Sequence, residues 1–273
     1  MIDRREQAAT YALLGVFSII ALVPIVGILL TALQEPGQVA NFGEPNGFHV
    51  ANFSKAWSDG HFSQYLRSSA IVVVAVVLIS GLLSILAGYA FGMMRFRGDQ
   101  VLFYLFLLGL MVPLESTVVP LYYDFRDLSL TDTYAALILP QAGVSLAFGT
   151  FWMRAFFRSV PRSLVEAARL DGSSSWSTLW RVVLPLGRPA VLTMTVLVFM
   201  WTWNEFLLAL VMIQSDDLRT APLGLALFAG ANRTQDPTLT AAAAVLVALP
   251  VVIVYVFLQR SFIRGMFAGG VKE

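Results

Sequence analysis

The chain has 273 residues, of which 58% are hydrophobic and 13% are charged. Average soluble domains carry roughly 25% charged residues, and the mean hydropathy of +0.74 also excludes an ordinary water-soluble protein. The absence of cysteine excludes disulfides and thiolate catalysis, and the two histidines, His49 and His61, are too few for a zinc motif. A formal net charge of +1 gives no reason to expect a nucleic acid partner. We therefore expect an integral membrane protein.

Six apolar segments are long enough to cross a bilayer as helices. About 20 apolar residues span the ~30 Å hydrocarbon layer, and such long segments exclude the strands of a membrane barrel. The expected spans are residues 11–33, 66–93, 101–120, 134–157, 189–213 and 239–258. The first is too long for the apolar part of a signal peptide, and no A-x-A-like site follows it. The sequence predicts an all-α membrane protein, with residues 1–273 as a single transmembrane domain.

The arginines and lysines are distributed unevenly between the two sides of this topology. Of the 18 in the chain, the side with both termini holds Arg4, Arg5, Arg95, Arg97, Arg154, Arg158, Arg162, Arg169, Arg181, Arg188, Arg260, Arg264 and Lys272. The other side holds Lys55, Arg67, Arg126, Arg219 and Arg233. Because basic residues accumulate in cytoplasmic loops, both termini are predicted to be cytoplasmic. An external loop at 34–64, rich in glycine and proline, is expected to be irregular.

Two features within the spans concern helix packing. Ser80, Ser84, Gly88 and Gly92 recur at every fourth position of the second span, which allows a neighbouring helix to approach closely. This pattern is common in membrane bundles and indicates no particular function. Pro250 removes a hydrogen bond from the sixth span and is expected to kink it.

The cytoplasmic loop at 158–188 begins with signals for a short helix. Pro161 suits a first helical turn, and Ser163 with Glu166 has the spacing of a capping box. Leu164, Ala167 and Ala168 are expected to share one face of this helix.

The same loop then carries signals for a turn and a second helix. Gly172 stands where the end of a helix needs a left-handed residue, the serines after it can cap another helix, and Pro185 is expected to end that helix. The apolar face of the pair is typical of a knob that docks on a partner, or of an amphipathic helix that lies on the membrane. Shape alone does not decide between these two interpretations.

At this loop the sequence resembles a known family. The residues Glu166-Ala167-Ala168, with Asp171-Gly172 and the later Leu184-Pro185, resemble the EAA loop of permease subunits from binding-protein-dependent ABC importers. Trp203-Asn204-Glu205-Phe206 and the tail at 259–265 and 269–272 are similar to the carbohydrate-uptake group, and most of all to the second of its two permeases. Ser173 stands where the family usually has Ala, Leu179 where it often has Phe, and the chain ends in Glu273 rather than Gly.

The resemblance implies how transport through this chain is powered. In that family the EAA loop forms a coupling helix that enters a cleft of a separate ATPase subunit. The residues expected at this contact are Glu166, Ala167, Ala168, Asp171 and Gly172. The sequence contains no G-x-x-x-x-G-K-[ST] motif, so ATP and Mg²⁺ are expected on the partner ATPase, with no cofactor or metal in this chain and no catalytic residues.

Polar residues in the fifth span are candidates for the substrate path. A buried carboxylate in a membrane is a functional candidate by default, and sugars bind through planar polar groups and aromatic faces. The candidates are Trp201, Thr202, Asn204 and Glu205. The alternative explanations are a structural hydrogen bond between helices for Glu205, and an ordinary position at the membrane interface for Trp201 and Trp203. Glu115, after Pro113, is expected to be structural or interfacial.

The sequence thus predicts one permease half of an ATP-driven sugar importer of the bacterial or archaeal cytoplasmic membrane. Its expected partners are a second homologous permease, two ATPase subunits, an extracytoplasmic sugar-binding protein and membrane lipid. An ion-coupled secondary transporter is a second possibility, but it would need more buried ionisable residues than Glu115 and Glu205. An intramembrane enzyme would need a nucleophile with its base, or a metal cluster. The transported compound is expected to be a sugar or, as in some relatives, a glycerol phosphate ester.

Overall fold

The computed structural model describes residues 4–36, 47–232 and 236–268, and within these ranges every regular element is a helix. The part of the predicted external loop at 37–46 and the tail residues 269–273 lie outside the described residues. The chain divides into two compact units. One consists of residues 1–63 and 223–250, and the other of residues 64–222 and 251–273.

The first unit contains the N-terminal helix, the short helix after it, and parts of two later helices. They are α1 (Arg4–Ala32), α2 (Ala51–Asp59), most of α12 (Ala221–Asn232) and the first part of α13 (Pro237–Ala268). The Asn52 side chain of α2 donates hydrogen bonds to the carbonyls of Ala32 and Gln34, at 3.0 and 2.8 Å. These bonds satisfy carbonyl groups that the end of α1 leaves without helical partners.

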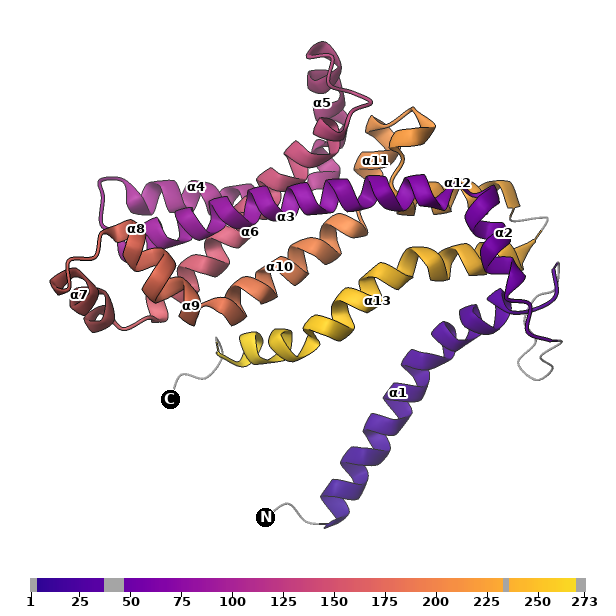
Figure 1. Ribbon diagram of the computed structural model, residues 1–273, viewed down its shortest axis with the longest axis horizontal. Helices are drawn as coiled ribbons and strands as arrows, with labels where there is room; N and C mark the ends of the chain where they lie inside the picture. The colour runs from indigo at the N-terminus through magenta and orange to yellow at the C-terminus, as the bar shows by residue number, and fades with distance from the viewer. Residues whose placement is uncertain (1–3, 37–46, 233–235, 269–273) are drawn as a thin grey trace. The chain divides into compact units, whose positions relative to one another are not determined.

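The second unit is a helical bundle around α6. Its elements are α3 (Phe62–Met93), α4 (Asp99–Met111), α5 (Leu114–Asp127), α6 (Tyr134–Ser159), α7 (Arg162–Leu170), α8 (Ser175–Ser177), the π-helical η1 (Thr178–Val183), α9 (Leu184–Leu186), α10 (Arg188–Trp203), α11 (Leu207–Met212) and the 3₁₀ turn η2 (Asp216–Leu218). Helix α6 packs against α4, α5, α10 and α11. In Figure 1, α7 to α9 lie at one end of α6 and α10, and α11 lies at the other end.

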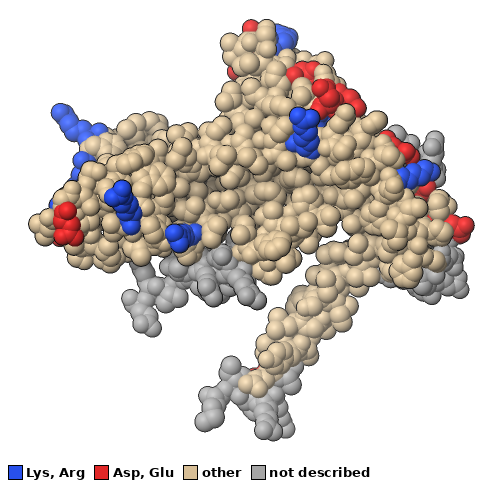
Figure 2. Space-filling view, in the orientation of Figure 1, with Lys and Arg blue, Asp and Glu red and all other residues tan. Residues whose placement is uncertain are grey.

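Charged side chains are concentrated at the two ends of this bundle. On the face in Figure 2, basic and acidic residues lie over α7 to α9 and over α5 and the segment after α11, while the surface between them is formed by other residues. An apolar band between two charged ends is the surface that a bilayer requires.

Helices α3 and α6 pack at very short distance along the predicted ridge of small residues. A Cβ atom added at Gly88 would lie 2.6 Å from the Cβ of Met153, and one at Gly92 would lie 2.8 Å from the Cβ of Phe157. Small residues on α6 complete the seam, since a Cβ at Gly149 would lie 2.2 Å from the Ser84 Oγ. The packing role predicted for the ridge is confirmed.

An arginine fastens α4 to this seam. The Arg154 guanidinium of α6 lies over the Phe103 ring of α4, 3.6 Å from its centroid, and its Nε donates to the Phe91 carbonyl of α3 at 3.3 Å. A cation over an aromatic face is attracted by the ring quadrupole, and more strongly where water is excluded. One side chain thus connects three helices.

Four of the six predicted spans are single helices long and apolar enough to cross a bilayer, with α1 qualifying over Ala9–Ala32 and α13 over Pro237–Gln259. The number rises to six if α4 with α5, and Ser175–Leu186 with α10, each count as one bent span. The second of these pairs begins in the predicted cytoplasmic loop and leaves out α11, so its bounds differ from the predicted span 189–213. The third span is broken because α4 and α5 meet at 95°. Pro113 explains this break, since the residue before a proline is restricted to extended conformations and Val112 has φ −88° and ψ 112°.

The sixth span continues through its proline. Helix α13 runs from Pro237 to Ala268 with Pro250 inside it, and the boundary between the two compact units falls directly after Pro250. The kink expected there stays a prediction, as does the assignment of residues 1–273 to a single domain.

A carboxylate joins two loops at the α11 end of the bundle. Asp132 accepts hydrogen bonds from the backbone N–H groups of Gln214 and Ser215, each at 2.9 Å, and from the Ser215 hydroxyl. Its own N–H donates to the Met212 carbonyl at 2.9 Å. The hydroxyl and amide of Ser215, together with the Gln214 amide, hold the pKa of the Asp132 carboxyl below its usual value.

We expect the Asp132 bonds to stabilise the protein at neutral pH and to be lost in acid. Because the folded pKa is lowered, this contribution is present above the unfolded pKa of roughly 3.9 and disappears as the pH falls through the folded value. Thermal unfolding of the wild type and of Asp132→Asn, measured from about pH 7 down to about pH 3, should give midpoints that converge in acid. Equal midpoints at neutral pH would contradict this role.

Candidate coupling loop and substrate path

The first helix of the loop begins without a side-chain cap. Pro161 occupies the N-cap position with φ −57° and ψ 130°, and α7 starts at Arg162. Ser163 therefore lies inside the first turn, where its hydroxyl does not cap the helix. The predicted capping box of Ser163 and Glu166 is wrong, because the helix begins one residue before Ser163.

The end of α7 has the geometry that the sequence indicated. Gly172 adopts a φ of +80°, its N–H bonds to the Arg169 carbonyl at 3.0 Å, and the N–H of Ser173 bonds to the Ala168 carbonyl at 2.9 Å. These two bonds define a Schellman motif, which requires a left-handed residue after the helix. The prediction for Gly172 is confirmed, and two backbone hydrogen bonds fix the shape of the turn.

The two faces of α7 differ in exposure. Val165 and Ala168 are buried on the side that packs against η1, and Ala168 is only 8% exposed. Glu166, Ala167 and Asp171 are exposed, together with Leu164 and Leu170. Helical spacing places Leu164, Ala167 and Ala168 on one side of α7, as predicted. Of the three, Leu164 and Ala167 are exposed and Ala168 is buried.

Sequence reasoning overlooked Leu170, which is 89% exposed at the end of α7. Its spacing of three residues from Ala167 was the signal that could have found it. Leu164, Ala167 and Leu170 form an exposed apolar stripe with Glu166 beside it, which we call the α7 stripe.

A second helical segment connects this loop to the bundle. The Ser174 hydroxyl accepts from the Ser177 N–H at 3.2 Å, so the predicted serine cap is confirmed. The segment Ser175–Leu186 then meets α10 at 80°. Helical structure continues one residue past Pro185, so the proline does not itself end the helix. The bend falls at Gly187.

In the fifth span, α10 ends at Trp203 and helical structure resumes with α11 at Leu207. In the break, the Asn204 amide donates to the Met200 carbonyl at 2.7 Å. The Glu205 carboxylate accepts from the N–H groups of Leu208 and Ala209, at 2.7 and 3.2 Å. The predicted span over 189–213 is therefore two helices with a break at 204–206, where the Glu205 carboxylate bonds N–H groups at the start of α11 in place of helical carbonyls.

The four candidates for the substrate path divide into two pairs. Trp201 and Asn204 are exposed on the same side of α10, three residues apart. Thr202 is buried, and the Glu205 carboxylate is bonded to the backbone of α11. Of the four candidates, Trp201 and Asn204 are exposed, Glu205 is half-buried and Thr202 is buried.

An aromatic contact positions the Trp201 ring. Phe148 of α6 meets it edge to face with ring centroids 4.7 Å apart, an arrangement favoured by the ring quadrupoles. The Trp152 indole on the same helix donates to the Ala190 carbonyl of α10 at 2.9 Å. Sequence reasoning missed Phe148, since only its four-residue spacing from Trp152 marked it.

The break between α4 and α5 lies near the break between α10 and α11. Glu115 occupies the first turn of α5 and is exposed, helix α5 packs on α11, and the carboxylates of Glu115 and Glu205 interact electrostatically. In the described part of the chain, no group of three or more His, Asp or Glu residues could hold a metal ion.

A comparison with protein families is decisive here. The family described as "Binding-protein-dependent transport system inner membrane component" matches residues 80–268. The chain belongs to this family. The matched range contains all of residues 158–188, the candidate coupling loop, and both broken spans.

Individual relatives of this permease take up sugars. It is 31% identical to the diacetylchitobiose uptake system permease protein NgcG of Streptomyces coelicolor, over 94% of this chain and 86% of that protein. It is 32% identical to the arabinooligosaccharides transport system permease protein AraQ of Halalkalibacterium halodurans, over 93% of this chain and 92% of that protein. The chain is a permease subunit of a carbohydrate ABC importer.

A solved structure has the same fold. A chain of a bacterial ABC transporter that imports the acidic polysaccharide alginate superposes with a TM-score of 0.80 and 26% identity, covering 96% of this permease and 99% of that chain. A second alginate transporter structure, at 14% identity, superposes with a TM-score of 0.67 and supports the fold.

For the permease we predict that Glu205→Ala lowers sugar uptake while assembly and basal ATPase activity persist. The substitution removes both bonds to the start of α11, and losing a helix cap costs about 1 kcal/mol. That is enough to shift the break beside Asn204 without unfolding the bundle. Uptake and ATPase rates in proteoliposomes measure the two effects. Uptake at the wild-type rate would contradict the prediction, and loss of assembly would show that the carboxylate is needed for folding.

Proposed function

We propose that this permease is one half of a heterodimeric permease pair, and that two separate ATPase subunits drive the pair through residues 158–188. The observation that carries the proposal is the direct connection from α7, through Ser175–Leu186, to α10. A force on the α7 stripe is thereby transmitted to the helix that bears Trp201 and Asn204. Glu166, Ala167, Asp171 and Gly172 form the contact, while Ala168 supports it from the buried face.

Transport proceeds by alternating access. ATP binding closes the ATPase subunits, draws the two coupling loops together and opens the permease pair outward, where an extracytoplasmic binding protein releases its sugar. Hydrolysis restores the inward-facing state. ATP can shift this equilibrium only because the ATPase subunits bind it with different affinity in the two states. The excess of arginine on the side of the α7 loop supports a cytoplasmic position for that loop and for both termini.

The substrate path includes Trp201 and Asn204. Trp201 lies about 20 Å along α10 from Arg188, at ~1.5 Å per residue, and is 52% exposed. This depth is away from the membrane interface that tryptophan prefers, and an indole N–H in lipid would lack a partner. A sugar path supplies hydroxyl groups for the indole and for the Asn204 carbonyl oxygen. Thr202, which is buried, and Glu205, which bonds the backbone of α11, support this surface from the inner side of the helix.

Reconstitution tests the proposal. The permease, its second permease, the ATPase and the binding protein are assembled in proteoliposomes, and uptake of labelled diacetylchitobiose, arabinooligosaccharide and trehalose is measured. We expect uptake only when ATP and the binding protein are both present. Uptake by the permeases without the ATPase, driven by an ion gradient, would overturn the proposal and favour an ion-coupled secondary transporter.

A further inference from the structure

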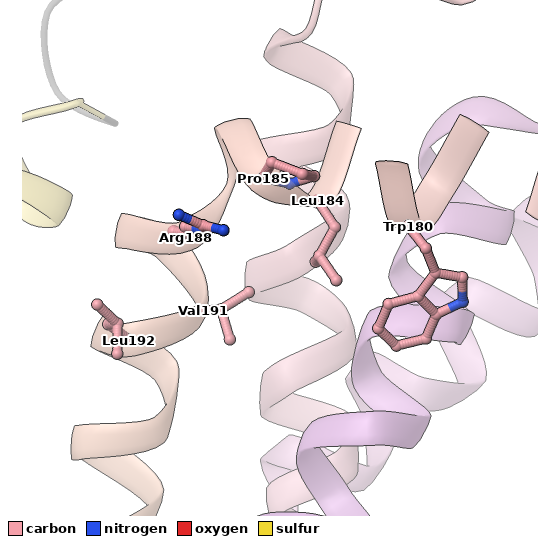
Figure 3. Close-up of a pocket in the computed structure, with 6 residues that line it drawn as sticks. All are labelled: Trp180, Leu184, Pro185, Arg188, Val191 and Leu192. Carbon is pink, nitrogen blue, oxygen red and sulfur yellow. The ribbon is translucent and has the colours of Figure 1, made fainter. Parts of the chain in front are cut away.

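A cavity lies at the corner where the segment Ser175–Leu186 meets α10. Its volume of about 340 Å³ lies within the range of roughly 300–1,000 Å³ typical of ligand pockets. We call it the corner pocket. It is lined by Trp180, Leu184, Pro185, Arg188, Val191 and Leu192. Figure 3 shows Leu184 and Val191 extending into the space between the two helices, with Trp180 on one side and Arg188 beside Pro185. Both arms of the 80° bend thus contribute to the walls.

The chemistry of the corner pocket is apolar with a single positive charge. Arg188 is the only charged residue in its lining. It is exposed, and none of the ion pairs found within the described residues involves it. A sugar would require several hydrogen-bonding groups, and a nucleotide would require more than one cation. A ligand with one anionic group and an apolar chain matches this lining.

The depth of the corner pocket agrees with such a ligand. The apolar part of α10 begins directly after Arg188 and Pro189, so Arg188 marks the end of the membrane-crossing stretch. Trp180 faces the same cavity. Tryptophan is enriched at the level of the lipid headgroups, and arginine near the end of a helix directs its charge to that level. The pocket therefore opens where a phosphate and the first part of an acyl chain are both present.

We propose that the corner pocket binds one anionic phospholipid, with its phosphate on Arg188 and its acyl chain along Leu184, Val191 and Leu192. The inference rests on the proposed function in one respect, the cytoplasmic position of the α7 loop, because the cytoplasmic leaflet carries the anionic lipids. The bound lipid fills the space between the segment Ser175–Leu186 and α10. It therefore supports the corner through which the ATPase acts on the substrate path.

The test measures lipid retained by the purified importer. The complex is reconstituted in vesicles of phosphatidylcholine with one quarter phosphatidylglycerol, extracted in mild detergent, and analysed for bound phospholipid by mass spectrometry. We expect phosphatidylglycerol to be enriched on the wild type and its affinity to fall about fivefold in Arg188→Gln, since one surface arginine contributes ~1 kcal/mol of attraction to an anionic lipid surface. Val191→Trp places a larger side chain in the cavity and should abolish the enrichment of phosphatidylglycerol.

Arg181→Gln is the matched control, because Arg181 is exposed on the neighbouring segment Ser175–Leu186 but does not line the corner pocket. It should keep the enrichment. Equal loss in Arg181→Gln and Arg188→Gln would show unspecific attraction and overturn the proposal. Retention that depends on neither arginine would overturn it as well, and is the result expected if the second permease covers the pocket. ATP-dependent uptake by the wild type tests the proposed function separately, so the two failures are distinguishable.

Discussion

Replacing Gly172 with valine should uncouple the ATPase from the permease while the permease pair remains in the membrane. The φ of +80° at Gly172 strains a β-branched residue, although the space around this position is open. Strain of about 1–3 kcal/mol corresponds to a 5- to 150-fold loss of the native turn. The α7 stripe would then meet the ATPase in the wrong orientation. Co-purification of the ATPase and hydrolysis stimulated by the binding protein measure the loss.

Gly172→Asn is the control for this prediction. Asparagine tolerates a left-handed backbone and is found at the ends of helices with this motif, so most of the coupling should persist. Wild-type ATPase content and stimulation in Gly172→Val would show that the turn does not determine coupling. A loss of similar size in both variants would show that the side chain at this position, rather than the backbone conformation, disturbs the contact.

The close packing of α3 on α6 predicts the second large effect. Gly88→Ala should reduce the amount of folded permease, because its Cβ would lie 2.6 Å from the Met153 Cβ and 3.0 Å from the Arg154 backbone nitrogen. The two helices would have to separate, and overpacking of this kind costs typically about 1–3 kcal/mol. Thermal unfolding in detergent, followed by size-exclusion chromatography, measures the loss.

Gly143→Ala provides a comparison on α6 itself. No atom lies within 4 Å of a Cβ placed at Gly143, and alanine favours the helix over glycine by about 1 kcal/mol. This variant should be as stable as the wild type or more so. Equal midpoints for Gly88→Ala and Gly143→Ala would show that the seam can widen at no cost.

The locations of the spans could be predicted from the sequence, but their interruptions could not. The length of an apolar run indicates how much of the chain can lie in lipid. This criterion identified α1, α3, α6 and α13. Pro113 and Asn204 stood within such runs, where neighbouring helices frequently accommodate a break. Pro113 and Glu205 favour a break locally, but whether the chain bends there also depends on what packs on it, such as α11 on α5. That information is not local.

The candidate site shows the same limit. Gly172 could be predicted because a helix end depends on a few adjacent residues, and the Schellman bonds lie within them. The burial of Ala168 could not be predicted, because η1, which packs on α7, begins ten residues later in the chain. Phe148 was missed because it contacts Trp201 from a helix 53 positions earlier in the chain. For Ala168 and Phe148, the deciding contact is distant in sequence, whereas the predicted capping box of Ser163 failed because the start of α7 was misplaced by local residues.

The Schellman motif has a consequence for how such a subunit can diverge. The turn after α7 is held by backbone groups and one glycine, and no side chain packs around Gly172. Ser173, which differs from the usual family residue, contributes only its N–H, to the Ala168 carbonyl. Side chains next to the turn can therefore be exchanged without changing the direction of α7. Selection can therefore adjust the proposed contact with a particular ATPase one residue at a time, while the backbone of the turn keeps its conformation.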